Sequence, residues 1–293
     1  MNKRTGLFLT LFTILILATA CGGDDGPVLR VGGIPDQDAS RLARRYDQFS
    51  DYLSNRLGVK VEYVPATDYA AVVTAFVRGD VQLAFFGGFT GYQARLSDPG
   101  SEAIAQREQD AKFTSDFIVG PSVSAQSLEE LKSVAGEITF TFGSESSTSG
   151  HLMPRFFMEE IGLDPDTDFK TVPNYSGSHD LTWRLVESGA FNAGVLNHDV
   201  WQRAVDEHLV DTDKVRELER SPEYFDYNWT VRADLDEEFR VGFKDEIQAA
   251  LLEMDENGQD EILELFSTSR FIESNNANYR ELEQVIKELE LGN

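Results

Sequence analysis

A cluster of hydroxyl side chains lies just before an apolar segment in the middle of the chain. Residues 140–154 read FTFGSESSTSGHLMP, and the apolar run that follows is expected to form a helix over residues 151–162. Ser147, Thr148 and Ser149 are of the types that cap helix N-termini. Because such an end carries partial positive charge and unpaired N–H groups, it can bind a tetrahedral oxyanion without Lys or Arg.

Two other interpretations of the hydroxyl cluster stay open at this point. One Ser or Thr is enough to cap a helix, so a plain polar loop is also consistent with the pattern. A secreted hydrolase with a Ser nucleophile is the second alternative, and its serine would need a neighbouring base. Gly143 and Ser144 are followed by Glu145, so the sequence lacks the G-x-S-x-G turn of that chemistry.

Short apolar strands alternate with amphipathic helices on both sides of the cluster, which implies parallel β-α-β units. Before the cluster, strands are expected at 28–34, 59–66 and 81–88, and helices at 39–58 and 68–80. From residue 128 on, helices are expected at 128–136, 151–162, 180–190, 200–210, 236–255 and 279–291, with strands at 137–143 and 192–197 and a strand or edge segment at 214–222.

This pattern predicts an α/β fold of two lobes with a ligand cleft between them. The polar loops FFGGFTGY (85–92) and FGSESSTSG (142–150) both follow predicted strands. Ligands of open α/β sheets bind beyond the carboxyl ends of the strands, so both loops are candidate cleft walls. We expect residues 28–117 and 224–293 to form lobe 1, and residues 118–223 to form lobe 2.

The charge of the chain excludes one large class of partner. Its 293 residues contain 51 Asp and Glu against 26 Lys and Arg, a formal net charge of −25. A nucleic acid needs a basic surface, so none is expected as a partner. A dense acidic surface suits a saline habitat, where counterions screen its self-repulsion. This hypothesis predicts that the protein loses stability at low ionic strength.

The N-terminus has the features of an export signal. Lys3 and Arg4 precede the short apolar run at 6–20, which ends in small residues, so residues 1–20 are expected to be a signal peptide. Cys21, the only cysteine, follows in a context, LATAC, that resembles the lipobox of bacterial lipoproteins. The resemblance implies lipidation of Cys21, with residues 21–27 as a tether and the protein held at the outer face of the cytoplasmic membrane or in the periplasm. An incidental cysteine beside an ordinary cleavage site is the alternative.

Several sequence blocks together resemble a known family. STSGHLMP follows TFTFGS, and NYSGSHDLTWRLVESGA comes later, while DYAAVVTAFVRGDVQLAFFGGFTGYQAR precedes both. These blocks are similar to the phosphonate- and phosphite-type periplasmic solute-binding proteins of ABC importers, in particular to a subgroup often labelled as selenate transporter binding proteins. The resemblance covers nearly the whole mature chain. It implies a type II periplasmic binding protein fold, no enzymatic activity, and capture of a small oxyanion for a permease and its ATPase subunit.

The resemblance also implies a set of ligand-binding residues. Ser147, Thr148 and Ser149 would hold the oxyanion, and Tyr69 from lobe 1 and His179 from lobe 2 would donate hydrogen bonds. Further candidates line the first-lobe side or brace the opposite wall: Phe86, Gly87, Gly88, Phe89, Thr90 and Asn197.

Phe86 departs from the Tyr or Trp that relatives binding phosphonates commonly carry there. A phenyl ring can form a pocket wall but donates no hydrogen bond. Asp180 and Asp199 are candidates to read the cation of an amino-substituted phosphonate, and both are also placed to cap helices.

No motif indicates a cofactor, a metal or a nucleotide. The D-x-D-x-D run at Asp164 resembles a calcium loop, but Phe169 and Tyr175 replace its required glycine and bidentate acid. His198 and His208 lack partners at metal spacing. The chain is therefore expected to act without a cofactor. It is also expected to be a monomer. A ligand-sensing lipoprotein that signals to a membrane kinase is a further alternative to transport.

Overall fold

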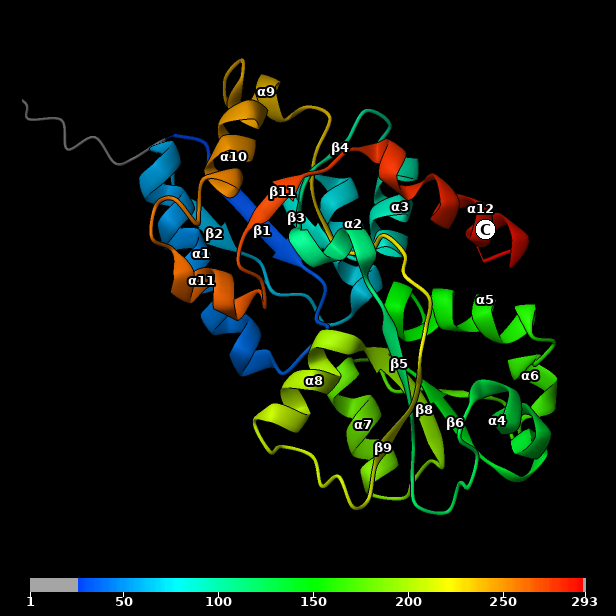
Figure 1. The fold of residues 1–293 in the computed structure, drawn as a ribbon. Helices are drawn as coiled ribbons and strands as arrows, with labels where there is room; N and C mark the ends of the chain where they lie inside the picture. Colours follow the sequence, from blue (N-terminus) through cyan, green and yellow to red (C-terminus); the bar gives the residue numbers. More distant parts are fainter. Residues whose placement is uncertain (1–25, 292–293) are drawn as a thin grey trace, which may run out of the picture.

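Two mixed β-sheets, one in each lobe, organise the protein in the computed structural model, which describes residues 26–291 (Figure 1). The strands of lobe 1 are β1 (Leu29–Gly33), β2 (Val61–Tyr63), β3 (Leu83–Phe86), β4 (Glu102–Arg107), β10 (Asn228–Val231) and β11 (Phe271–Glu273). Their order in the sheet is β11-β4-β10-β3-β1-β2. The strands of lobe 2 are β5 (Ser115–Val119), β6 (Phe140–Phe142), β7 (Asn174–Tyr175), β8 (Ala193–Asn197) and β9 (Arg216–Arg220), in the order β7-β6-β8-β5-β9.

Helices cover these sheets. Those of lobe 1 are α1 (Ala39–Leu57), α2 (Tyr69–Arg78), α3 (Gly88–Ser97), α9 (Leu235–Glu238), α10 (Phe243–Leu252), α11 (Asp260–Leu265) and α12 (Arg280–Glu288), with 3-10 turns at Glu108–Lys112 and Asn276–Tyr279. Those of lobe 2 are α4 (Leu128–Val134), α5 (Met153–Glu160), α6 (Pro165–Asp168), α7 (His179–Glu187) and α8 (His198–Asp206), with a 3-10 turn at Ala135–Glu137 and a π-helical turn at Thr148–Leu152.

The boundaries of α1 and α2 follow from local capping. The Asp68 carboxylate accepts a hydrogen bond from the N–H of Ala71 and so begins α2. Gly58 and Gly79 end the two helices with φ values of 67° and 81°, a left-handed conformation that costs little only for glycine. Both helices therefore begin and end close to the predicted residues.

The expected parallel pairing holds for only part of each sheet. β1 pairs in parallel with β2 and β3, and β6 pairs in parallel with β7 and β8. β10 is antiparallel to β3 and β4, and β5 is antiparallel to β8 and β9. The reason is topological, because β5 and β10 enter their sheets directly from the other lobe instead of through a covering helix.

Two chain segments, residues 108–114 and 221–227, cross between the lobes side by side (Figure 1). Phe113 and Tyr224 exchange backbone hydrogen bonds of 2.8 and 3.0 Å, so an isolated antiparallel bridge joins the two crossings. The boundary expected after residue 117 falls inside β5, which pairs along its whole length with strands of lobe 2.

Each lobe has its own apolar core. In lobe 1, Trp229 stacks on Phe49 with ring centroids 4.6 Å apart, and burial of each such ring contributes about 1.5–3 kcal/mol. Lobe 2 has one buried cluster around Phe140 and another around Trp201. No helix within residues 26–291 combines the length and apolar composition that a membrane span requires. Cys21 and the expected signal peptide lie outside the described residues.

Candidate functional site

Four buried polar atoms meet at the seam between the lobes without a hydrogen-bond partner anywhere in residues 26–291. They are the Tyr69 hydroxyl, Nε2 of His179, Oδ1 of Asp36 and Oδ2 of Asp226. Leaving one buried polar group unpaired costs about 1–3 kcal/mol, so several at one place call for an explanation. The four atoms come from both lobes and from the second crossing segment.

The hydroxyl cluster forms one wall of this site. Ser147 begins the π-helical turn, and its Oγ accepts a hydrogen bond of 2.9 Å from the N–H of Gly150. Thr148 Oγ1 accepts a bond of 2.9 Å from the N–H of Phe89, which belongs to the other lobe. The carbonyl of Ser149 accepts the Ser115 hydroxyl at 2.7 Å. All three cluster residues are buried, and the helical segment begins at Thr148, three residues earlier than expected.

Glycine at position 150 lets two loops approach each other. A Cβ atom there would lie 3.1 Å from Cα of Gly143 and 3.1 Å from Cε1 of His179. It would also lie 3.0 Å from Oγ of Ser147, the cap of its own turn. A side chain at position 150 would therefore fit only if Gly143, Ser147 or His179 shifted by a few tenths of an ångström.

His179 is built to donate a hydrogen bond as a neutral ring. It is the first residue of α7, and its Nδ1 accepts the backbone N–H of Asn197 at 3.3 Å. The proton of the neutral ring must then lie on Nε2, the atom without a partner. Burial lowers the pKa of His179 to about 4, so the ring is uncharged at neutral pH.

Tyr69 provides a second donor from the opposite lobe. It is the first residue of α2, and its hydroxyl lies beside Ser147 without forming a hydrogen bond. Burial raises the pKa of Tyr69 well above its usual value, and the nearby Asp36 carboxylate adds to the effect. The phenol therefore keeps its proton and can donate it.

The loop after β3 contributes differently from the expectation. The segment that begins at Gly88 is helix α3, and the Gly88 N–H donates to Oδ1 of Asp226 at 3.0 Å. Thr90 Oγ1 donates to the carbonyl of Gly87 at 3.2 Å. The ring of Phe86 is fully buried and packs edge-on against Phe76 in the core of lobe 1. The N–H groups of Gly88 and Phe89 are thus paired with Asp226 of the second crossing segment and with Thr148 of lobe 2.

Three residues that the sequence analysis did not select lie in this site. Asp36 follows β1, and Asp226 and Tyr227 lie in the second crossing segment. The Tyr227 hydroxyl donates to Oδ2 of Asp36 at 3.0 Å and accepts the side-chain amide of Asn197 at 2.9 Å. Burial raises the pKa of Asp226 to about 7. The sequence does contain one indication that Asp226 belongs to a site: it is a carboxylate between two aromatic residues, Phe225 and Tyr227, in a segment that joins the lobes.

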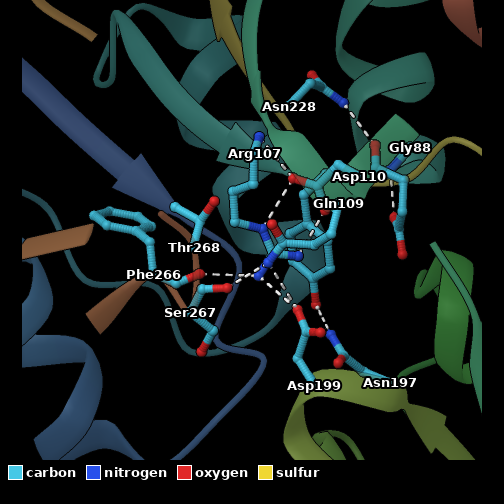
Figure 2. Close-up of polar contacts among 12 residues, drawn as sticks. Gly88, Arg107, Gln109, Asp110, Asn197, Asp199, Asn228, Phe266, Ser267 and Thr268 are labelled. Atoms are coloured by element: carbon cyan, nitrogen blue, oxygen red, sulfur yellow. Dashed lines mark hydrogen bonds and ion pairs between the residues drawn. The ribbon is translucent and has the colours of Figure 1, made fainter. Parts of the chain in front are cut away.

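The two carboxylates considered for an amino group are engaged by protein cations. Asp180 accepts the N–H of Asp38 at 2.8 Å and pairs with Arg203 at 3.3 Å. Asp199 pairs with Arg107 at 3.0 Å (Figure 2). Neither carboxylate is thus free to neutralise a ligand ammonium group.

The electrostatics of the site suit an anion without a formal counterion. Tyr69 and His179 begin helices α2 and α7, and the hydroxyl cluster begins the segment that leads into α5, so three positive helix ends converge. Arg45 lies 3.8 Å from Oδ1 of Asp36. Among residues 26–291, no group of three or more His, Cys, Asp or Glu side chains is placed to hold a metal ion.

The geometry gives no support to a serine nucleophile. His151, the histidine next to the cluster, bonds through Nδ1 to the carbonyl of Glu145 and through Nε2 to Arg155. Burial lowers its pKa to about 4. The hydroxyl of Ser147 is occupied as a helix cap, and the other histidine of the site, His179, carries its ring proton on the unpaired Nε2. Neither histidine is thus arranged to act as a base for Ser147.

Comparison with known proteins decides the family. Residues 31–279 match the family model described as "ABC transporter, phosphonate, periplasmic substrate-binding protein". The chain belongs to this family. It is 39% identical over 266 residues to the probable ABC transporter phosphite binding protein PhnD1 of Prochlorococcus marinus, which covers 89% of this chain and 90% of that protein. It is also 29% identical over 225 residues to the phosphate-import protein PhnD of Mycolicibacterium smegmatis, covering 68% of this chain and 65% of that protein.

The solved structure of the Prochlorococcus PhnD1 in complex with methylphosphonate superimposes with a TM-score of 0.86 at 40% identity. The match covers 90% of this chain and 98% of that one. The predicted fold, that of a two-lobed periplasmic binding protein, is thereby confirmed. Proteins of this family are substrate-binding components of ABC transporters and not enzymes, which confirms that part of the prediction as well.

Proposed function

We propose that this chain binds a small tetrahedral phosphorus oxyanion that carries at least one P–OH group, such as phosphite or a phosphonate. The four unpaired atoms at the seam are the observation that carries the proposal. Tyr69 and His179 offer hydrogens to anionic oxygens, whereas the carboxylates Asp36 and Asp226 offer acceptors that a P–OH group can satisfy. An oxyanion without a proton has no hydrogen to donate to these two oxygens, so binding it would leave both of them unpaired. The proposal therefore disfavours selenate and sulfate.

Binding is coupled to closure in this proposal. Tyr69 lies in lobe 1, and His179 and the hydroxyl cluster lie in lobe 2, so one oxyanion contacts both lobes only when they are closed. Such differential contacts are what shift an open-closed equilibrium. A membrane permease would then recognise the closed form, receive the ligand and use its ATPase subunit for transport. Neutral donors favour later release, because no buried ion pair has to be broken.

Titration calorimetry with phosphite, methylphosphonate, phosphate, selenate and sulfate tests the ligand class. We expect heat from the phosphorus oxyanions and none from selenate or sulfate. Absence of heat with every ligand would overturn the oxyanion proposal, and equal binding of sulfate and phosphite would overturn the role of the carboxylates.

The site is tested with the variant Ser147→Ala/Thr148→Ala. The matched control is Ser127→Ala, which removes the cap of α4 in lobe 2, where Oγ accepts the N–H of Glu130 at 3.2 Å. Both variants lose cap stability, but only the double variant should lose affinity. Unchanged affinity in the double variant contradicts the site.

We further propose that the mature protein is a monomer anchored through lipid on Cys21. Two acyl chains suffice for stable membrane attachment. Mass spectrometry of the mature N-terminus and fractionation of Cys21→Ala test the anchor, which is refuted if the variant stays with the membrane to the same extent. Light scattering after size exclusion tests the monomer.

A further inference from the structure

A buried arginine lies at the junction of the two lobes (Figure 2). Arg107 ends β4, and its guanidinium binds both oxygens of Asp110, at 2.9 and 2.6 Å. A third hydrogen bond, of 3.0 Å, reaches the carbonyl of Phe266. These three contacts lie within lobe 1 and the start of the first crossing segment, so they can persist however the lobes move.

The fourth contact of this guanidinium crosses the seam. Its Nη1 donates to Oδ2 of Asp199 at 3.0 Å, and Asp199 lies in the first turn of α8 in lobe 2. The side-chain amide of Gln109 adds a weaker contact of 3.4 Å to the same oxygen. The side chain of Asp199 is 20% exposed and that of Asp110 is 0% exposed, so Asp199 is accessible to water in this structure and Asp110 is not.

The same arginine is connected to the oxyanion site. Its guanidinium carbon lies 4.6 Å from the centre of the Tyr227 ring. The Tyr227 hydroxyl bonds to Asp36 and to Asn197, which caps α8 two residues before Asp199. Arg107 thus holds both the aromatic ring and the helix start that reach the site.

We propose that Arg107 is a positioning residue that clasps lobe 2 to lobe 1 through Asp199 and thereby sets how tightly the bound oxyanion is retained. The clasp rests on the proposed oxyanion function and touches no ligand. It adds the same stabilisation to the closed form whichever ligand is bound, so it scales all affinities by one factor and leaves their ratio unchanged. Because capture occurs in the open form, the factor appears in the dissociation rate.

The variant Asp199→Asn tests the clasp, and Asp206→Asn is the matched control. Asp206 is the last residue of the same helix, and on the exposed surface it accepts a hydrogen bond from Gln202. Its replacement by Asn removes the same charge as Asp199→Asn does. We expect Asp199→Asn to weaken phosphite and methylphosphonate alike, by about tenfold, through faster dissociation, whereas the control binds as the wild type does. Asp199→Glu, which keeps the charge, should recover part of the loss.

Two outcomes overturn the clasp. One is equal affinity of Asp199→Asn and Asp206→Asn, and the other is a changed ratio of phosphite to methylphosphonate affinity, which would make Asp199 a ligand contact. If the wild type binds no oxyanion, the proposed function fails separately. X-ray scattering of the ligand-free proteins then decides the clasp, because Asp199→Asn should have a larger radius of gyration than the control, and equal radii reject it.

Discussion

His179 illustrates how burial produces a neutral hydrogen-bond donor. Its Nδ1 accepts the N–H of Asn197, burial lowers its pKa to about 4, and its Nε2 has no hydrogen-bond partner within residues 26–291. A charged imidazolium would attract an anion more strongly, but its charge would vary with pH near its usual pKa. The neutral ring keeps one protonation state at neutral pH.

Replacing this donor by an apolar ring should weaken oxyanion binding strongly. A hydrogen bond to a charged group contributes about 1.5–3 kcal/mol, so His179→Phe is expected to raise Kd on the order of 10- to 100-fold. Calorimetry at pH 7 measures the change, and His208→Phe, on the exposed surface, is the control. Equal Kd values for the two variants would remove His179 from the site.

Asp226 should make stability depend on pH. Its pKa of about 7 in the folded chain exceeds the ordinary value of 3.8. Its contribution to stability is therefore fully present below about pH 4 and is lost as the pH rises through 7. Asp226→Asn lacks this loss, so its melting temperature relative to the wild type should rise between pH 4 and pH 8. A constant difference across this range would contradict the raised pKa.

In the candidate site, the sequence indicated the proposed donors more readily than the proposed acceptors. Ser147, Tyr69 and His179 stand at helix starts in recognisable motifs, and all three are buried. Asp36 and Asp226 are single carboxylates in connecting segments, and only the paired lobes bring them beside the donors. Their burial comes from the packing of distant segments of the chain and not from any local pattern.

At the scale of the elements, α3 shows why a local pattern can mislead. The N-cap and the first turn of α3 contain the three glycines of GGFTG, two of them inside the helix. Glycine costs about 1 kcal/mol in a helix, so a loop was expected. Asp226 and Thr148 satisfy the N–H groups of Gly88 and Phe89 from distant parts of the chain. These hydrogen bonds from distant residues stabilise the start of α3, where the neighbouring residues in sequence provide no side-chain cap.

The packing of the π-helical turn gives a prediction for Gly150→Ala. The added methyl group would press on Gly143, Ser147 and His179, and such overpacking costs about 1–3 kcal/mol in free energy of unfolding. Urea denaturation measures the loss, and calorimetry should show weaker oxyanion binding because His179 is displaced. Gly136→Ala is the control, since its Cβ would meet only an ordinary contact of 3.8 Å. Equal stability of both variants would show that the turn can relax.

For the whole molecule, the excess of acidic groups should make stability depend on salt. The net charge is −25, so the acidic groups repel one another. Salt weakens this repulsion, because at 0.1 M charges farther apart than about 10 Å are largely screened. Surface pairs such as Lys244–Glu102 weaken in salt but contribute little each. We expect the melting temperature to rise from low to high NaCl concentration. A melting temperature that does not change with salt would refute the saline-habitat hypothesis.

The two-lobed plan was predictable from alternating elements, while the antiparallel strands were not. β10 has no covering helix before it and follows a crossing segment, so its neighbours in the sheet depend on where the chain re-enters lobe 1. It lies between β3 and β4, strands that precede it by more than a hundred residues. Periodicity within β10 holds no information about this insertion.

That central position of β10 determines the order in which the lobes can be completed. All strands of lobe 2 lie between residues 115 and 220, and its two ends are joined by hydrogen bonds of 2.9 Å between Ser115 and Ser221. Because the chain is synthesised from its N-terminus, lobe 2 can finish folding while lobe 1 still lacks the strand in the middle of its sheet. The lobe that comes second in the sequence is the first to mature, and until residue 231 has emerged the facing edges of β3 and β4 remain open to mispairing.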